Sequence, residues 1–157
     1  MQLTSEAFSP GGQIPTRFTC EGENVSPDLA WRDAPPQTKA FVLIVHDPDA
    51  PRAGGYTHWV VYNMPAQKGH IVENAPKRDI VEGLGLQGKN DGGSVGYKGP
   101  CPPSGRHRYF FRLFALDQEI SIAPGATHKE VAEAMAKHII DRAELMGTYS
   151  KNAEQVA

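Results

Sequence analysis

The stretch Val42–Asn63, "VLIVHDPDAPRAGGYTHWVVYN", places a polar segment between two apolar runs. The first run extends back to Ala40 and is rich in β-branched residues, which predicts a central strand over 40–46 that is covered on both faces. The second run predicts the next strand, over 58–63. A plain hairpin needs only a turn, so the acids, prolines and histidines between the runs indicate either a turn that happens to be acidic or a site that lies on a turn.

Working outward, the segment before 40 predicts short extended pieces broken by Gly and Pro, with four candidate core residues: Ile14, Phe18, Leu29 and Trp31. The segment "HRYFFRLFALD", 107–117, predicts a third strong strand. Its period of two puts one set of side chains on a single face: His107, Tyr109, Phe111 and Leu113. Residues 64–99 predict little more than a short helical turn over 76–81 and a glycine-rich loop.

One longer helix is expected near the C-terminus. Thr127 and Glu130 form a capping-box pattern. Apolar residues then recur at near-helical spacing up to Gly147: Val131, Met135, Ile139 and Met146. This pattern predicts a helix that packs one face on a mainly β body.

The composition indicates one ordinary globular domain over 1–157. Hydrophobic residues make up 39% and charged residues 22%, while 16 Gly and 13 Pro favour a turn-rich fold over a helical bundle. The formal net charge of -2 gives no basic field for nucleic acid. No long apolar run, signal-peptide pattern, basic amphipathic helix or lipidation motif occurs, so we expect a cytoplasmic protein without stable membrane insertion. In that reducing compartment Cys20 and Cys101 should be free thiols, with a disulfide as the alternative.

The polar segment carries two neighbouring carboxylates. Asp47 precedes Pro48, which favours extended backbone, and Asp49 follows two residues later, so both side chains would leave the same face. They could serve a site, or they could cap their own backbone in Asx turns. The short connection to His58 should bring that histidine toward Asp47. Such a pair can orient or charge the imidazole, although a buried histidine hydrogen-bonded to a neighbour is an equal alternative.

A third polar cluster, "GYKGPCPPSGRHRY", feeds directly into the strand at His107. Its prolines fix the loop shape, and its glycines would let backbone amides approach a ligand.

The segments "DPDAP", "THWVVYNMP" and "GPCPPSGRHRYFFRLFALD", in that order and with "ENVSPDLAW" near the start, resemble the signature motifs of the phosphatidylethanolamine-binding protein family. The resemblance covers about residues 1 to 150 and is strongest to the bacterial Raf kinase inhibitor-like (YbhB/YbcL) branch. It implies a PEBP-like antiparallel β-sandwich with peripheral short helices and an anion-binding cavity at one end of the main sheet. It also implies a cis peptide between Ala50 and Pro51.

The resemblance assigns the following residues to that cavity: Asp47, Asp49, Pro51, Tyr56, His58, Gly99, Pro100, Pro102, His107 and Tyr109. Tyr56 is a substitute for a loop tyrosine of animal members, because the connection from Asp49 to His58 is shorter here. No catalytic residue, metal ligand or cofactor is assigned. The implied partners are a small anionic or phosphorylated ligand, a protein kinase or a serine protease, and a second copy in a homodimer.

An anion site that contains two aspartates needs compensating donors. The candidates are charged His58 and His107, the amides of the Gly99–Gly105 loop, and the Tyr109 hydroxyl. Asp47 could instead accept a hydrogen bond from a protonated phosphate oxygen, which would make a monoanion the preferred ligand.

Two enzymatic alternatives use the same residues. Carboxylates and imidazoles suit a metal-dependent hydrolase, although His46 would point away from Asp47 along a strand. Cys101 and His107 could form a nucleophile and base, but no third orienting group is evident. The sequence therefore favours a non-catalytic binding protein with a preformed pocket.

Overall fold

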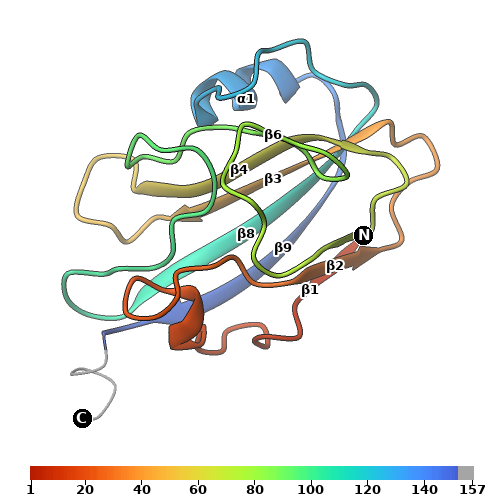
Figure 1. Ribbon diagram of the computed structural model, residues 1–157. Coiled ribbons are helices and arrows are strands. Elements are labelled where there is room, and N and C mark those ends of the chain that lie inside the picture. The colour runs from red at the N-terminus through yellow and green to blue at the C-terminus, as the bar shows by residue number, and fades with distance from the viewer. Residues whose placement is uncertain (152–157) are drawn as a thin grey trace.

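The two strands that flank the polar segment pair with each other at the centre of the fold. The computed structural model describes residues 1–151 (Figure 1). β3 (Ala40–Asp47) pairs antiparallel with β4 (Tyr56–Pro65) on one side and with β8 (His107–Leu116) on the other. The three strands predicted from the apolar runs are therefore confirmed.

These strands form the middle of a six-stranded antiparallel sheet with the order β6-β7-β4-β3-β8-β9. Its outer strands are β6 (Ile80–Val81), β7 (Gly85–Gln87) and β9 (Ile139–Tyr149). A smaller antiparallel sheet has the order β1-β2-β5, with bounds Gln2–Thr4, Leu29–Arg32 and His70–Ile71. The helical elements are a 3-10 turn, η1 (Thr16–Phe18), and one α-helix, α1 (His128–Met135). The predicted mainly β, antiparallel architecture is confirmed, except for its C-terminal part.

Each face of the larger sheet is covered by a different layer. Because side chains alternate along β3, Leu43 and Val45 enter the core shared with the small sheet, whereas Val42 enters the core beneath α1. Figure 1 shows α1 on one side of the larger sheet and β1 and β2 on the other. The four candidate core residues of the N-terminal segment are all buried in the inter-sheet core: Ile14, Phe18, Leu29 and Trp31.

The predicted C-terminal helix is correct at its start and wrong at its end. Thr127 caps the helix, and the reciprocal hydrogen bonds with Glu130 complete the capping box. The helix ends at Met135, and Ile139–Tyr149 forms β9 instead, paired with β8 over its length. Inward and outward residues alternate along β9, with Leu145, Gly147 and Tyr149 buried, and this period of two does not include the helically spaced Met146.

Two further expectations are wrong. Residues 76–81 contain no helical turn in the structure, and Ile80 and Val81 instead form β6. The peptide between Ala50 and Pro51 is trans, as are all peptide bonds in residues 1–151. The Arg52 amide donates to the Ala50 carbonyl at 2.7 Å, so a tight turn around Pro51 forms with the trans isomer, which X-Pro bonds prefer.

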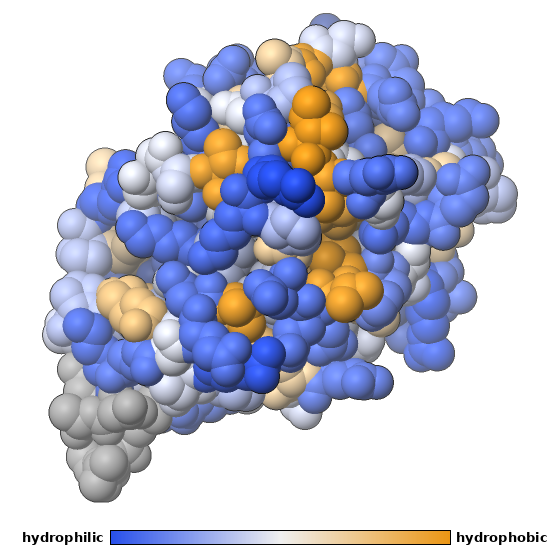
Figure 2. Space-filling view, in the orientation of Figure 1, coloured by the Kyte–Doolittle hydropathy of each residue, from blue (hydrophilic) through white to orange (hydrophobic). Residues whose placement is uncertain are grey.

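The surface in Figure 2 is largely hydrophilic, with separate hydrophobic groups between the polar ones. Over residues 1–151 the large apolar side chains with high exposure are Val72, Ile80 and Ile140. Within the same range, no helix has both the length and the apolar character needed to cross a membrane.

Candidate ligand-binding cavity

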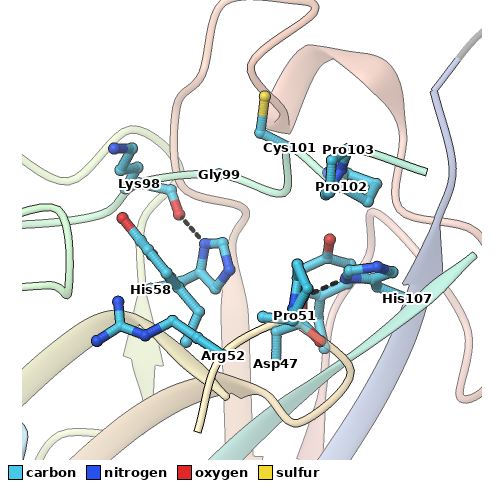
Figure 3. Close-up of a pocket in the computed structure, with 13 residues that line it drawn as sticks. Asp47, Pro51, Arg52, His58, Lys98, Gly99, Cys101, Pro102, Pro103 and His107 are labelled. Atoms are coloured by element: carbon cyan, nitrogen blue, oxygen red, sulfur yellow. Dashed lines mark hydrogen bonds and ion pairs between the residues drawn. The ribbon is translucent and has the colours of Figure 1, made fainter. Parts of the chain in front are cut away.

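A cavity of about 380 Å³ opens where β3 ends and where β4 and β8 begin. Antiparallel pairing explains the meeting of distant residues, because Asp47 at the end of β3 lies opposite Tyr56 in β4. Figure 3 shows His58 on one side of the cavity and His107, Asp47 and Pro51 on the other, below the loop of Cys101–Pro103. The structure brings the following predicted residues to the cavity wall: Asp47, Pro51, Tyr56, His58, Gly99, Pro102, His107 and Tyr109.

Aromatic and imidazole rings form one wall. Tyr56 and His58 share a face of β4, and His107 and Tyr109 share a face of β8, because residues two apart point the same way along a strand. The ring centroids of His58 lie 4.7 Å from Tyr56 and 5.2 Å from Tyr109. The wall is therefore largely apolar, with polar atoms at a few fixed positions.

Asp47 is both a turn cap and a partner for a histidine. It is only 2% exposed, and its Oδ1 accepts the Asp49 amide at 2.7 Å, so the expected Asx turn is present. Its Oδ2 accepts a hydrogen bond from His107 Nδ1 at 2.6 Å. Of the two alternatives for His58, the pair with this carboxylate does not form, because the neighbouring strand that delivers the imidazole is β8.

His58 is bonded to the backbone instead. Its Nδ1 lies 2.6 Å from the Lys98 carbonyl oxygen, an acceptor, so Nδ1 carries the proton. Burial lowers the pKa of His58 to about 4, although this hydrogen bond and the Asp47 charge oppose the shift. The imidazole is therefore neutral near pH 7, contrary to a cationic His58, and its other nitrogen, Nε2, faces the cavity as an acceptor (Figure 3).

Asp49 does not line the cavity. Its two oxygens form a bidentate pair with the Arg108 guanidinium, both at 2.9 Å, and Oδ2 also accepts the Arg108 amide. These hydrogen bonds from Arg108 lower the pKa of Asp49 to about 2. The second carboxylate is thereby turned out of the site and neutralised at the surface.

In the loop that follows Lys98, Gly99 and the three prolines offer no free backbone amide to a ligand. The Gly99 amide donates to the side chain of Asn24 at 2.7 Å, and the three prolines have no N–H. Glycine is required at 99 for packing, because a Cβ there would lie 2.3 Å from the Phe18 carbonyl oxygen. Pro100 does not line the cavity; its carbonyl accepts the Cys20 amide at 3.1 Å.

The two cysteines are joined in a disulfide, so the expectation of free thiols is wrong. Cys20 and Cys101 have a Cα–Cα distance of 5.4 Å, within the range a disulfide spans. The bond ties the segment after η1 to the loop over the cavity, next to the Cys20–Pro100 hydrogen bond. With its sulfur in this bond, Cys101 presents no thiolate to His107.

Tyr109 contributes a hydroxyl that the protein does not satisfy. Its oxygen is buried and has no hydrogen-bond partner within residues 1–151, although the residue lines the cavity. Burial, followed by the charge of Asp47, raises the pKa of Tyr109, so the hydroxyl keeps its proton and can donate. A buried donor without an acceptor in the chain is uncommon in native proteins.

Sequence reasoning missed five lining residues: Ala50, Arg52, Lys98, Cys101 and Pro103. All five are immediate neighbours of residues that were assigned. Arg52 directly follows the "DPDAP" segment and Lys98 directly precedes "GPCPPSGRHRY", and these positions could have indicated a role in the cavity. A basic residue in a loop is, however, most often solvated. No cluster of three His, Cys, Asp or Glu side chains suited to a metal occurs in the described residues.

The fold and the cavity define a mainly β protein with a preformed pocket at one end of its larger sheet. A family model described as phosphatidylethanolamine-binding protein matches residues 4–150. A UPF0098 protein from Methanothermobacter thermautotrophicus is 47% identical over 151 residues, which cover 96% of this chain and 99% of the relative. A UPF0098 protein from Chlamydia trachomatis is 44% identical over 97% of this chain and 100% of its own length.

Two solved structures show the same family resemblance in three dimensions. The crystal structure of a putative phosphatidylethanolamine-binding protein homolog from Chlamydia trachomatis has a TM-score of 0.87 and 44% identity, covering 96% of this chain and 97% of that one. Escherichia coli YbcL also has a TM-score of 0.87, at 34% identity over 96% of this chain and 98% of its own. The chain belongs to the phosphatidylethanolamine-binding protein family, in its UPF0098 or YbhB/YbcL branch.

Proposed function

We propose that this protein is a non-catalytic binding protein whose cavity holds a phosphate-like anion. The unpartnered hydroxyl of Tyr109 carries the proposal, because an anionic oxygen in the cavity would accept its hydrogen bond. His107 adds a second ring to the same wall, held in place through Nδ1 by Asp47. Family membership supports a ligand-binding role, and the pairing of Asp49 with Arg108 removes one of the two aspartate charges that would repel an anion.

The neutral His58 supports a singly protonated ligand. Its Nε2 accepts a hydrogen bond rather than donating one, so it suits a P–OH group of a phosphate monoanion. The oxygens of Asp47 already accept from Asp49 and His107, which makes His58 the better acceptor for that proton. Since the second pKa of a phosphomonoester is near ~6, affinity should fall between pH 6 and 8.

Isothermal titration calorimetry with inorganic phosphate tests both statements. Tyr109→Phe deletes only the hydroxyl, and the loss of one hydrogen bond to an anion, about 1.5 kcal/mol or more, should weaken binding at least about tenfold. Asp49→Asn is the matched control, because that carboxylate faces Arg108 and should leave phosphate affinity unchanged. Equal affinity for Tyr109→Phe and the unmodified protein would refute the proposal. Affinity that rises from pH 6 to 8 would refute the monoanion.

The molecule that carries the anion is addressed by a separate screen. Phospholipid head groups, nucleotides and phosphorylated proteins all present a phosphate, so a phosphate site alone does not distinguish them. The expected kinase, protease and homodimer partners are likewise not identified by the fold and the site. We would screen phosphopeptides and phospholipid vesicles against the protein and against His58→Ala and Asp47→Asn. Binding that neither substitution alters would place the contact outside the cavity.

A further inference from the structure

Two basic side chains at the cavity have no acidic partner. Arg52 and Lys98 both line it, and both lie over the ring of Tyr56, at 5.5 Å and 5.8 Å from the centroid. Neither forms an ion pair within residues 1–151, whereas Arg108 is paired with Asp49 and Arg112 with Glu144. Two positive charges that share one ring repel each other, so the arrangement favours an anion that compensates both.

The backbone holds both residues in place. The Gly55 amide donates to the Arg52 carbonyl at 3.1 Å, which closes the turn before β4. Gly55 has a φ of +74°, and a Cβ there would lie 2.4 Å from the Asp47 carbonyl oxygen, so this close return of the chain requires glycine. Lys98 is fixed to β4 twice, through its amide to the His58 carbonyl at 2.9 Å and through its own carbonyl to His58 Nδ1.

The two cations lie at one end of the cavity. Figure 3 places Arg52 and Lys98 on the His58 side, opposite His107 and Pro102. Among residues 1–151, Asp47 is the only acid that lines the cavity, and both of its oxygens are already bonded. No lining carboxylate therefore competes with a ligand for Arg52 and Lys98.

Resting on the proposed function, we propose that the ligand carries two anionic groups. The first is the phosphate-like group beside Tyr109 and His107, and the second lies between Arg52 and Lys98 at the His58 end. A ligand with a positive charge at that end would be repelled. The cavity is thereby selective for a dianionic small molecule over a zwitterionic phosphate ester such as phosphoethanolamine.

Two probes of similar length separate these ligand classes. 2-Phosphoglycolate carries a carboxylate where phosphoethanolamine carries an ammonium. Calorimetry should show at least about tenfold tighter binding of 2-phosphoglycolate than of phosphoethanolamine. Raised ionic strength should reduce this ratio, because Arg52 and Lys98 are exposed and salt screens their charges. Arg52→Gln and Lys98→Gln should each move the ratio of the two affinities toward one. Arg106→Gln is the matched control, because Arg106 is an exposed cation of the same loop that does not line the cavity, and it should leave the ratio unchanged.

Three results would overturn this inference. Equal affinity for the two probes, with inorganic phosphate still bound, would refute the second anionic group and leave the proposed function intact. A ratio that Arg52→Gln and Lys98→Gln leave unchanged, or that Arg106→Gln lowers equally, would show a general charge effect instead. Absence of binding by inorganic phosphate and by both probes would refute the proposed function together with the inference.

Discussion

Asp47 and Asp49, two positions apart in the sequence, occupy opposite environments. Asp47 is buried at the cavity wall with His107, whereas Asp49 forms a surface pair with Arg108. The Asx turn separates them, because it bends the chain directly after Asp47 and cancels the strand alternation that would have kept them on one face. The neutral His58 shows a similar dependence on environment, since burial outweighs the hydrogen bond and the carboxylate that favour its charged form.

His58 should make the fold sensitive to moderate acid. Well above pH 6.5, His58 is neutral in both the native and the unfolded protein, so its protonation does not lower the stability of the native state there. As the pH falls from 6.5 toward about 4, the unfolded chain takes up a proton that buried His58 does not. The native state should lose about 3 kcal/mol over this window.

His58→Gln, whose amide can donate to the Lys98 carbonyl without titrating, should lose less stability over the same window. Urea unfolding at a series of pH values between 7.5 and 4 measures the difference. The control is His70→Gln, which replaces an exposed histidine of β5 and should follow the unmodified protein. Parallel pH profiles for His58→Gln and the unmodified protein would show that His58 does not titrate as described.

Among the elements, the loop over the cavity depends on one covalent bond. The disulfide closes a separation of 81 residues between the segment after η1 and this loop. We expect Cys20→Ser combined with Cys101→Ser to lower the free energy of unfolding by roughly 2 to 5 kcal/mol. Urea unfolding measures this, and reductant should bring the unmodified protein to the same midpoint without affecting the variant. A midpoint that reductant does not move would contradict a stabilising bond.

Because disulfides are rare in reducing compartments, the cytoplasmic location stays a prediction.

The strands differ in how well their sequences define them. β3, β4 and β8 are long apolar runs buried on both faces or alternating clearly, and their positions were predicted closely. The edge strand β9 was taken for helix, because Ile139 and Met146 lie seven residues apart, which fits helical spacing, whereas pairing with β8 makes the segment a strand. The short strands β5, β6 and β7 hold two or three residues each, too few for any period to appear.

At the scale of the molecule, the site could be predicted where it lies on strand ends and not where it depends on loop packing. Antiparallel pairing of β3, β4 and β8 brings Asp47, His58 and His107 together. The bonding partners within the site, such as Lys98 for His58, follow from how the loop packs against η1 through Gly99. No local pattern encodes that contact, which joins residues about eighty positions apart.

The whole domain should unfold as one unit although it has two cores. β3, β4 and β8 contribute side chains to both, so neither core can be lost while the shared sheet stays intact. Both tryptophans, Trp31 and Trp59, lie in the inter-sheet core, and Met135 lies in the core beneath α1. Met135→Ala should cost about 2 to 5 kcal/mol.

The same substitution should shift the urea midpoint equally by tryptophan fluorescence and by far-ultraviolet circular dichroism, with an unchanged m-value. Leu113→Ala, in the core that contains the tryptophans, is the matched comparison and should give the same coincidence of the two probes. If Met135→Ala moved the circular dichroism transition while the fluorescence transition stayed in place, the two cores would unfold separately. The larger sheet would then not couple the core beneath α1 to the inter-sheet core.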